Sequence, residues 1–241
     1  MSDKKTIVVT GYPKSGNTWI ARLVAELVGC PINGFWSHRK TDDRGIEELD
    51  RISDYCCYKS HDQYHECSSR INDITHLVYV VRDPRDIVIS GAHYFKFKGI
   101  FPNSLRSKIK KMFKTVLNGR KKTHYYCRIP WSQHVKPFIE NNIFYVKYEN
   151  MLLNPKEQCL RICEHLKIKV SEQKLLQAIE NQSFGNKKEF FKKIKNFNSY
   201  RHLRSGKMGE WKTQLSKVQI NRLTRELNPT LDLLGYTDPS S

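Results

Sequence analysis

Hydrophobic positions near the start of the chain change their period at one point. Thr6–Thr10 is β-branched at every position, which is typical of a short buried strand. From Thr18 onward the apolar side chains recur every three or four residues and predict one face of a helix. These positions are Ile20, Leu23, Val24 and Leu27. Gly11, Pro13 and Gly16 mark a tight loop in between. A strand, a glycine-bounded loop and a helix in this order direct backbone N–H groups toward an anion.

Short apolar runs alternate with helical patterns along the rest of the chain. Further strands are predicted at Tyr55–Ser60, His76–Val81 and Ile143–Val146. Helices are predicted from Pro84 onward, over Trp131–Glu140 and after Pro155. The polar stretch Gly29–Asp54 indicates loops, with a short helix expected over Gly45–Arg51.

This alternation predicts an α/β fold with a mostly parallel central sheet flanked by helices and a P-loop NTPase-like phosphate loop. We expect a single domain over residues 1–241. In such sheets, ligands bind beyond the carboxyl ends of the strands. Gly11–Gly16, His61, Arg82 and Tyr148 each follow a predicted strand. We therefore expect these residues to meet at one edge of the sheet.

The loop has the frame G-x-x-x-x-G-N-T, whereas a nucleotide triphosphatase loop has G-x-x-x-x-G-K-[ST]. The lysine of the second pattern is missing, and a lysine stands inside the loop instead, as Lys14 beside Ser15. The backbone arrangement for binding a phosphate is kept, but the usual contact with the β- and γ-phosphates is lost. The alternative is a strand-to-helix turn whose glycines only ease chain reversal.

Composition favours anionic ligands or partners. The 241 residues carry 42 Lys and Arg against 24 Asp and Glu, a formal net charge of +18. Such a charge suits nucleic acid, a sulfated or phosphorylated ligand, or an anionic membrane surface. The chain shows no signal-peptide pattern and no apolar run long enough to span a membrane, so a cytoplasmic location is expected.

Cysteine usage indicates neither disulfides nor a zinc ribbon, because the seven cysteines are odd in number and form no C-x-x-C pair. One cluster has metal-ligating side chains, but its spacing fits no standard site. It consists of Cys56, Cys57, His61, His65 and Cys67. No metal site is predicted. Cys159 and Cys163 lie four apart on the apolar face of a predicted helix and are expected in the core.

Six segments carry a more specific pattern, in a fixed order along the chain. They are Tyr12–Trp19, Lys59–His61, Tyr79–Asp86 with Ser90, Tyr148–Met151 with Asn154 and Pro155, Ser183–Phe184, and Arg204–Lys212. Together they resemble the motifs of the cytosolic-type sulfotransferases. Those enzymes use 3′-phosphoadenosine 5′-phosphosulfate (PAPS) as sulfuryl donor and release 3′-phosphoadenosine 5′-phosphate (PAP).

The resemblance implies a role for each matching residue. The 5′-phosphosulfate would contact Lys14, Ser15, Gly16, Asn17 and Thr18. The 3′-phosphate would contact Arg82, Ser90, Arg204, Ser205 and Gly206. The adenine would contact Trp19, Tyr148, Ser183 and Phe184. Catalysis would fall to His61, Lys14 and Lys59. No metal would be required.

These residue types also suit sulfuryl transfer by in-line displacement. The protein mainly positions the reactants and stabilises spread negative charge. Lys14 can neutralise the departing phosphate oxygen. His61 can take the proton of a hydroxyl or amine acceptor, because imidazole titrates near neutrality. Arg82 and Ser90 form a fork-plus-hydroxyl clamp for an anion.

Some alternatives are left open. A P-loop kinase lacks its G-K-[ST] lysine here and has no convincing metal-binding acid, and a non-enzymatic polyanion binder draws only on the net charge. No nucleic acid is expected, whereas peripheral membrane contact is an open alternative. Arg85 and Asp86 either form a surface pair or contact the donor. The family's dimer motif is degraded, since Lys212 and Ser216 fit it but Lys217 and Asn221 do not, so the oligomeric state is open.

The acceptor cannot be named from the sequence. Gly34–Asp54 and Tyr94–Ile129 are expected to shape its site. The second segment is rich in lysine and arginine, with Phe95, Phe97, Phe101 and Phe113 interleaved. We expect residues 94–130 to form a mobile cover over the acceptor, and its lysines to attract the acceptor if that is anionic.

Overall fold

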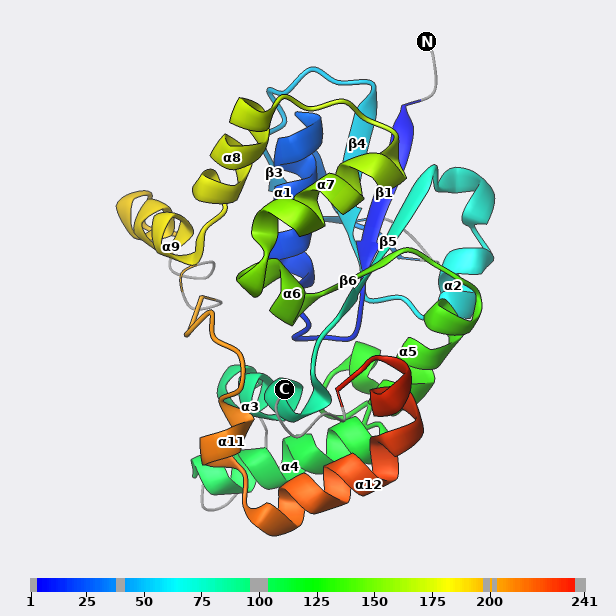
Figure 1. The fold of residues 1–241 in the computed structure, drawn as a ribbon, viewed down its shortest axis with the longest axis vertical. Coiled ribbons are helices and arrows are strands. Elements are labelled where there is room, and N and C mark those ends of the chain that lie inside the picture. The colour runs from blue at the N-terminus through cyan, green and yellow to red at the C-terminus, as the bar shows by residue number, and fades with distance from the viewer. Residues whose placement is uncertain (1–3, 38–41, 96–103, 197–199, 201–202, 237–241) are drawn as a thin grey trace.

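The computed structural model describes residues 4–37, 42–95, 104–196, 200 and 203–236. Its described strands form one six-stranded sheet in the order β3-β2-β4-β1-β5-β6 (Figure 1). The strands are β1 (Lys5–Thr10), β2 (Ile32–Phe35), β3 (Asp42–Glu47), β4 (Tyr55–Lys59), β5 (His76–Val81) and β6 (Tyr145–Lys147). Only β2 and β3 pair antiparallel, and the other neighbours are parallel. The predicted α/β class with a mostly parallel sheet is therefore confirmed.

The helices connect these strands and cover the sheet. They are α1 (Asn17–Val28), α2 (Tyr64–Ser68), α3 (Pro84–Tyr94), α4 (Leu105–Asn118), α5 (Trp131–Glu140), α6 (Tyr148–Leu153), α7 (Pro155–Leu166), α8 (Glu172–Asn181), α9 (Phe184–Lys193), α11 (Trp211–Gln214) and α12 (Lys217–Leu233). Two 3-10 turns, η1 (Ile71–Asp73) and η2 (Tyr125–Cys127), complete the described elements.

Two local expectations are wrong. Residues Gly45–Arg51 do not form a helix, because Asp42–Glu47 is strand β3 and pairs with β2, with Glu47 opposite Ile32. Hydrogen bonds from a neighbouring strand decide this stretch, and they are invisible in its own sequence. The fourth predicted strand begins two residues late, at Tyr145, and Tyr148 already starts α6.

Strand side chains alternate between two apolar clusters, one on each face of the sheet. Ile7 and Val9 of β1 pack with side chains of α1, α7 and α8. Val8, the residue between them, packs with the cluster that includes side chains of α3, α4, α5 and α12. Burial on both faces explains why residues 7–9 of β1 and 77–81 of β5 are apolar without interruption.

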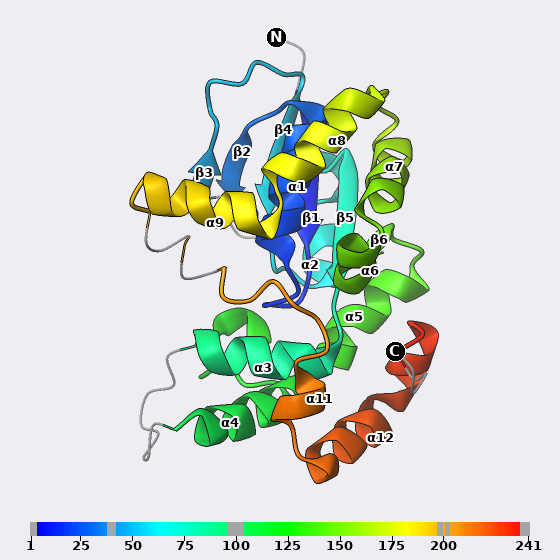
Figure 2. The same ribbon diagram turned by 60° about the vertical axis from the view of Figure 1, so that its left-hand side comes forward.

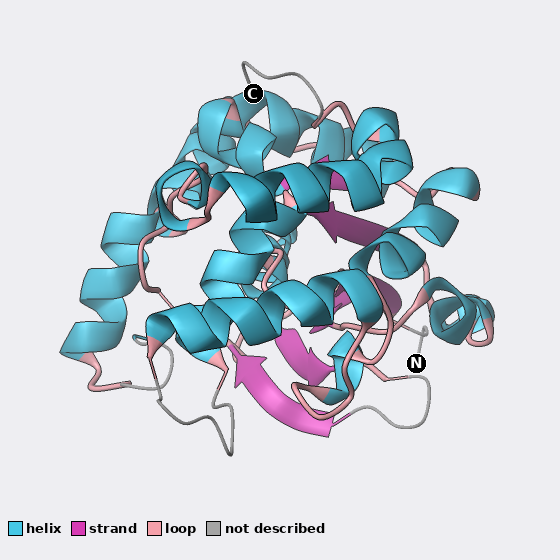
Figure 3. Ribbon diagram, turned by 90° about the horizontal axis from the view of Figure 1, so that it is seen from below, coloured by secondary structure: helices cyan, strands magenta, loops and turns pink. Residues whose placement is uncertain are grey.

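α3, α4, α11 and α12 gather at the end of the molecule toward which β1 and β5 run (Figures 1 and 2). From below, helices lie in front of the strands (Figure 3). The carboxyl ends of the parallel strands therefore face a helical layer.

The lysine-rich segment is partly a core helix. In α4, Ile109, Met112 and Phe113 are buried, while Lys110 and Lys114 are exposed. The helix packs against α3 and α12. Phe97 and Phe101 lie outside the described residues.

All seven cysteines are buried and carry free thiols. Six of them belong to the two apolar clusters, Cys67 and Cys127 to one and Cys30, Cys57, Cys159 and Cys163 to the other. Among the described helices, none is long and apolar enough to cross a membrane.

Candidate active site

The loop between β1 and α1 reverses the chain through two residues with a left-handed backbone. The φ angle is 77° at Lys14 and 98° at Gly16. A β-carbon on Gly16 would lie 2.6 Å from the ring of Tyr148. The left-handed backbone and the Tyr148 ring both disfavour a side chain at Gly16. The glycine is therefore needed for the close approach of Tyr148 as well as for the chain reversal.

One cavity of about 470 Å³ lies next to this loop. Most of the predicted site residues line it, namely Lys14, Gly16, Asn17, Thr18, Trp19, Lys59, His61, Arg82, Ser90, Tyr148, Phe184, Arg204, Ser205 and Gly206. Ser15 and Ser183 do not. Ser15 is fully buried, and the Ser183 hydroxyl caps α9 by accepting from the Asn186 N–H at 3.4 Å. The fold thus gathers segments from across the chain, but the roles of these residues stay predictions.

Lys14 is a buried cation among other cations. Burial lowers its pKa to about 7, and the nearby charges of Lys59, Arg82 and Arg204 act in the same direction. Its ammonium nitrogen lies 3.5 Å from the centre of the Tyr94 ring, a cation–π contact. A group that binds Lys14 through negative charge would relieve this repulsion.

His61 is held in one tautomer by the loop backbone. Its Nδ1 lies 2.8 Å from the carbonyl oxygen of Gly11, so Nδ1 must carry the proton and donate it. The amide nitrogen of Asn17 also lies 2.9 Å from this Nδ1, but its two hydrogens go to the carbonyl oxygens of Gly11 (2.7 Å) and Ser60 (3.1 Å). Burial, with repulsion from Lys59, lowers the pKa of His61 well below its ordinary value. The ring is therefore neutral near pH 7, with Nε2 able to accept a proton.

Arg82 connects two segments that are far apart in the sequence. Its guanidinium donates to the carbonyl oxygens of Lys14 (3.3 Å) and Lys207 (3.0 Å) and stacks 4.1 Å from the centre of the Tyr148 ring. Its Nε is buried and has no hydrogen-bond partner among the described residues. An unsatisfied buried donor in a cationic cavity fits an anionic ligand.

Arg204 and Ser205 both bind a carboxylate of their own loop. The guanidinium of Arg204 forms an ion pair with Glu210, and the Ser205 hydroxyl donates to the same carboxylate at 2.9 Å. Both residues line the cavity. To bind an anion there, each would have to give up its contact with the Glu210 carboxylate or to contact the anion and the carboxylate at once.

The adenine side of the predicted site is aromatic. Trp19 contacts Tyr148 edge-on at 5.5 Å between centroids, and its indole nitrogen donates to the carbonyl oxygen of Gln182 at 2.9 Å. Gln182 and Phe184 both line the cavity. The sequence does not single out Gln182, whose backbone rather than side chain makes this contact.

Aromatic rings also line the cavity beside His61. Its ring contacts Phe35 and Tyr126, with centroids 5.8 and 5.7 Å apart, and Tyr126 in turn contacts His124. Phe95 lines the same wall. These residues belong to the two segments expected to shape the acceptor site, although none of Phe35, His124 and Tyr126 is identifiable individually from the sequence. None of the four lysines of α4 is among the residues that line this cavity.

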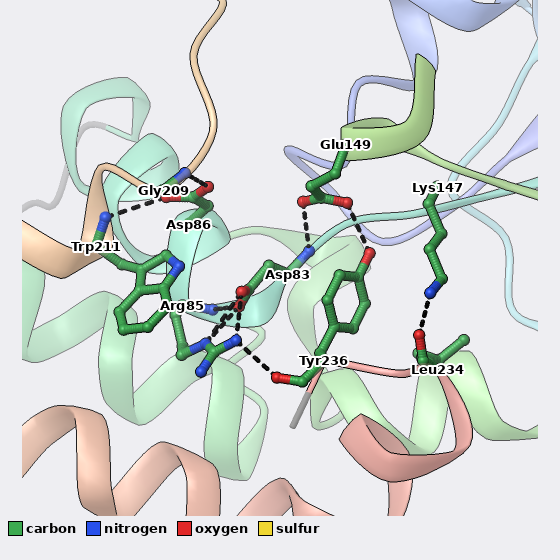
Figure 4. A network of polar contacts seen from close by, with 9 residues as sticks. All are labelled: Asp83, Arg85, Asp86, Lys147, Glu149, Gly209, Trp211, Leu234 and Tyr236. Atoms are coloured by element: carbon green, nitrogen blue, oxygen red, sulfur yellow. Dashed lines mark hydrogen bonds and ion pairs between the residues drawn. The ribbon is translucent and has the colours of Figure 1, made fainter. Parts of the chain in front are cut away.

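The expectation of a surface pair between Arg85 and Asp86 is wrong. Both are buried, and Arg85 pairs with Asp83 at 2.7 Å (Figure 4). Asp86 accepts hydrogen bonds from the backbone N–H groups of Gly209 and Trp211. Neither residue lines the cavity, so the structure offers no direct contact with a donor either.

No group of three or more His, Cys, Asp or Glu side chains that could hold a metal ion occurs within the described part of the chain. Cys57 is fully buried whereas His65 is exposed, so the cysteine–histidine cluster of the sequence is not assembled.

Two solved structures that contain PAP share this fold. Mouse sulfotransferase SULT7A1, solved in complex with PAP, superimposes with a TM-score of 0.73 at 20% identity, covering 98% of this chain and 89% of that one. A retinol dehydratase solved with androsterone and PAP gives a TM-score of 0.69 at 16% identity, covering 98% and 83%.

Sequence relatives agree. Sulfotransferase 1 family member D1 of Mus musculus is 24% identical over an alignment of 250 positions that covers 91% of this chain and 81% of the relative. The amine sulfotransferase of Oryctolagus cuniculus is 24% identical over an alignment of 255 positions that covers 92% of this chain and 79% of the relative. The family model of the sulfotransferase domain matches residues 26–235, so this chain belongs to the sulfotransferase domain family.

Proposed function

We propose that this protein transfers a sulfuryl group from PAPS to a hydroxyl or amine acceptor, with His61 as the general base. The observation that carries the proposal is the convergence of Lys14, Lys59, Arg82 and His61 on one cavity beside a glycine-bounded loop. Two relatives named above were solved with PAP, the product that such a donor leaves.

The chain's own groups divide into two anion sites. Lys14 and the N-terminus of α1 would hold the 5′-phosphosulfate, and protonated Lys14 would stabilise the charge that develops on the departing phosphate oxygen. Arg82 and Ser90 would hold the 3′-phosphate, and the Nε of Arg82, which has no partner among the described residues, would donate to it. Tyr148 and Phe184 would enclose the adenine.

His61 is oriented for its role before any substrate arrives. Because Nδ1 donates to the Gly11 carbonyl, only Nε2 can take the acceptor's proton. This carbonyl belongs to the phosphate loop, so the base and the donor's site are fixed to one another. Lys59 would add a second cation beside the transferring group.

The acceptor's side of the cavity suits an apolar body that ends in a hydroxyl or amine. Phe35, Phe95 and Tyr126 supply the apolar wall beside His61. The lysines of α4 lie elsewhere, which argues against their binding an anionic acceptor. Within residues 94–130, α4 packs into the core through Met112 and does not line the cavity. We therefore propose a covering role only for the residues of this segment that line the cavity, which are Tyr94, Phe95, His124 and Tyr126.

Donor binding is tested by thermal unfolding with PAP in the absence of magnesium. Saturating PAP at about 100 times its Kd should raise the melting temperature by about 5–10 °C, since ligand bound only to the folded state stabilises it. Adenosine 5′-phosphate, which lacks the 3′-phosphate, is the matched control and should shift it less. A melting temperature unmoved by PAP would refute the proposal.

Turnover is tested with labelled PAPS and a panel of phenols, alcohols and amines. His61→Ala should lower turnover on the order of 10²–10⁴-fold, as loss of a general base does, while PAP affinity stays near wild type. The exposed His65→Ala is the control and should leave both unchanged. If His61→Ala kept most of the activity, another base would have to be sought.

A further inference from the structure

The first turn of α3 joins three separate parts of the chain (Figure 4). Asp83 binds Arg85, and Arg85 also donates to the carbonyl oxygen of Tyr236 at 3.0 Å. Glu149 of α6 accepts from the Asp83 N–H at 3.0 Å and from the Tyr236 hydroxyl at 2.7 Å. These contacts fix α3 to α6 and to the end of the described chain. None of these four residues lines the cavity.

Asp86 makes the third connection, to the loop before α11. Its side chain is 1% exposed. One carboxylate oxygen accepts from the N–H of Gly209 at 2.6 Å, and the other accepts from the N–H of Trp211 at 3.1 Å. Two bonds to backbone groups two residues apart fix both the position and the orientation of this loop, independently of its side chains. The ring of Trp211 also packs 3.9 Å from the guanidinium carbon of Arg85.

The same loop brings basic and backbone groups to the cavity. Arg204, Ser205 and Gly206 line it, only a few residues before Gly209. Lys207 accepts from Arg82 through its carbonyl oxygen at 3.0 Å. On α3, Ser90 stands one turn after Asp86 and lines the cavity as well. Helix α3 therefore carries one predicted 3′-phosphate ligand and, through Asp86, holds the loop that carries three others.

We propose that Asp86 is a positioning residue for the sulfuryl donor. Its carboxylate holds residues 203–211 against α3, so that Arg204–Gly206 and the pair Arg82 and Ser90 form one site for the 3′-phosphate. The inference rests on the proposed function, because it assumes a donor with that phosphate.

An amide cannot replace this carboxylate. Asn has the same shape, but it offers one acceptor oxygen and places an NH₂ group opposite the second backbone N–H. One hydrogen bond is lost and a buried donor is left without a partner, which costs more than the bond itself. The loop should then leave its place on α3, and Arg204 should lose its fixed distance from Arg82.

The decisive experiment compares Asp86→Asn with wild type for two ligands, PAP and adenosine 5′-phosphate. We expect PAP to bind about tenfold more weakly or worse, the effect of losing one charge-assisted contact, while adenosine 5′-phosphate binds as before. In turnover, KM for PAPS should rise by a similar factor, with KM for the acceptor and kcat little changed. A merely structural role would instead lower kcat through a smaller folded fraction and leave both KM values alone.

Tyr236→Phe is the matched control. It removes one hydrogen bond from the same network, that of the Tyr236 hydroxyl to Glu149, but does not touch the loop. It should lower the melting temperature without changing the preference for PAP over adenosine 5′-phosphate. If Asp86→Asn weakened both ligands equally, or neither, Asp86 would have no positioning role.

A measurement on the wild type needs no variant. Amide hydrogen exchange at Gly209 and Trp211 should be slow in the ligand-free protein, because both N–H groups are bonded to a buried carboxylate. Exchange at the rate of an unfolded chain would overturn the inference even if PAP binds. Failure of the wild type to bind PAP would refute the proposed function itself, so the two failures are distinguishable.

Discussion

Lys14 and His61 must hold opposite protonation states for the proposed reaction, whereas burial in the cavity favours the neutral form of both. His61 has to be neutral to take a proton, and its pKa lies well below the ordinary imidazole value. Lys14 has to be charged, yet burial and neighbouring cations lower its pKa to about 7. In the free enzyme, a rise in pH through that value removes the charge that would stabilise the leaving group.

The pH profile of kcat/KM for PAPS should show this. Because kcat/KM reports groups of the free enzyme, we expect it to fall as pH rises through about 7, the pKa of Lys14. The acid limb should lie below the pH range in which ordinary histidines titrate. Lys14→Arg is the control, since its guanidinium stays protonated and should move the alkaline limb upward. An alkaline limb near the ordinary pKa of lysine in the wild type would contradict the assignment.

The motifs in the sequence were sufficient to predict which residues reach the cavity when those residues follow closely after a strand. His61 and Arg82 need only their strands to reach the cavity, so their motifs are good predictors. Ser183 shows the limit, because its hydroxyl caps a helix and a local contact of that kind leaves no trace in the motif. Tyr126 lies near His61 only because η2 packs against β2, a contact distant in sequence.

At the scale of elements, the phosphate loop and α6 are fitted to each other through Gly16. The ring of Tyr148, the first residue of α6, fills the space where a side chain at Gly16 would stand. The same ring stacks on Arg82. A change in the loop should therefore be transmitted to both predicted phosphate sites.

Gly16→Ala should lose stability and donor affinity together. The left-handed backbone costs an alanine on the order of 1 kcal/mol, and the displaced Tyr148 ring should weaken PAP binding at least several-fold. Gly29→Ala is matched in backbone strain, with φ +78°, but the nearest atom is the end of the Lys174 side chain at 3.5 Å. It should lower the melting temperature and leave PAP affinity unchanged. Equal PAP affinity in both variants would show that the loop and Tyr148 are not coupled.

Elements with an apolar period of their own were predictable, and β3 was not. Trp131–Glu140 is observed with its predicted bounds, and β5 with both of its ends. β3 carries acidic and basic residues, a glycine and only one large apolar side chain, Ile46. Its conformation depends on pairing with β2, and the Arg22–Glu47 ion pair joins its last residue to α1.

At the scale of the whole molecule, the net charge of +18 should act on the encounter with the donor. A strongly positive surface raises the association rate of an anion, and salt screens this attraction once the Debye length falls below the separation of the charges. The enclosed pairs within the cavity are screened much less.

We therefore expect kcat/KM for PAPS to fall several-fold between about 50 mM and about 500 mM salt, with kcat little changed.

The double variant Lys110→Gln with Lys114→Gln tests separately whether the lysines of α4 bind the acceptor. These side chains border a groove between α4 and α12 rather than the cavity, so KM for the acceptor should not change. A higher acceptor KM in this double variant would restore a role for the basic segment in acceptor binding.

The seven buried thiols have a practical consequence. Burial excludes alkylating reagents and raises the pKa of Cys57 and Cys67, so reaction requires the surrounding structure to open. Cys159 reports on one face of the sheet and Cys127 on the other. The native cysteines can therefore report local opening on each face of the sheet, without any introduced label. Rates of thiol modification with and without PAP would measure how far donor binding stiffens each face separately.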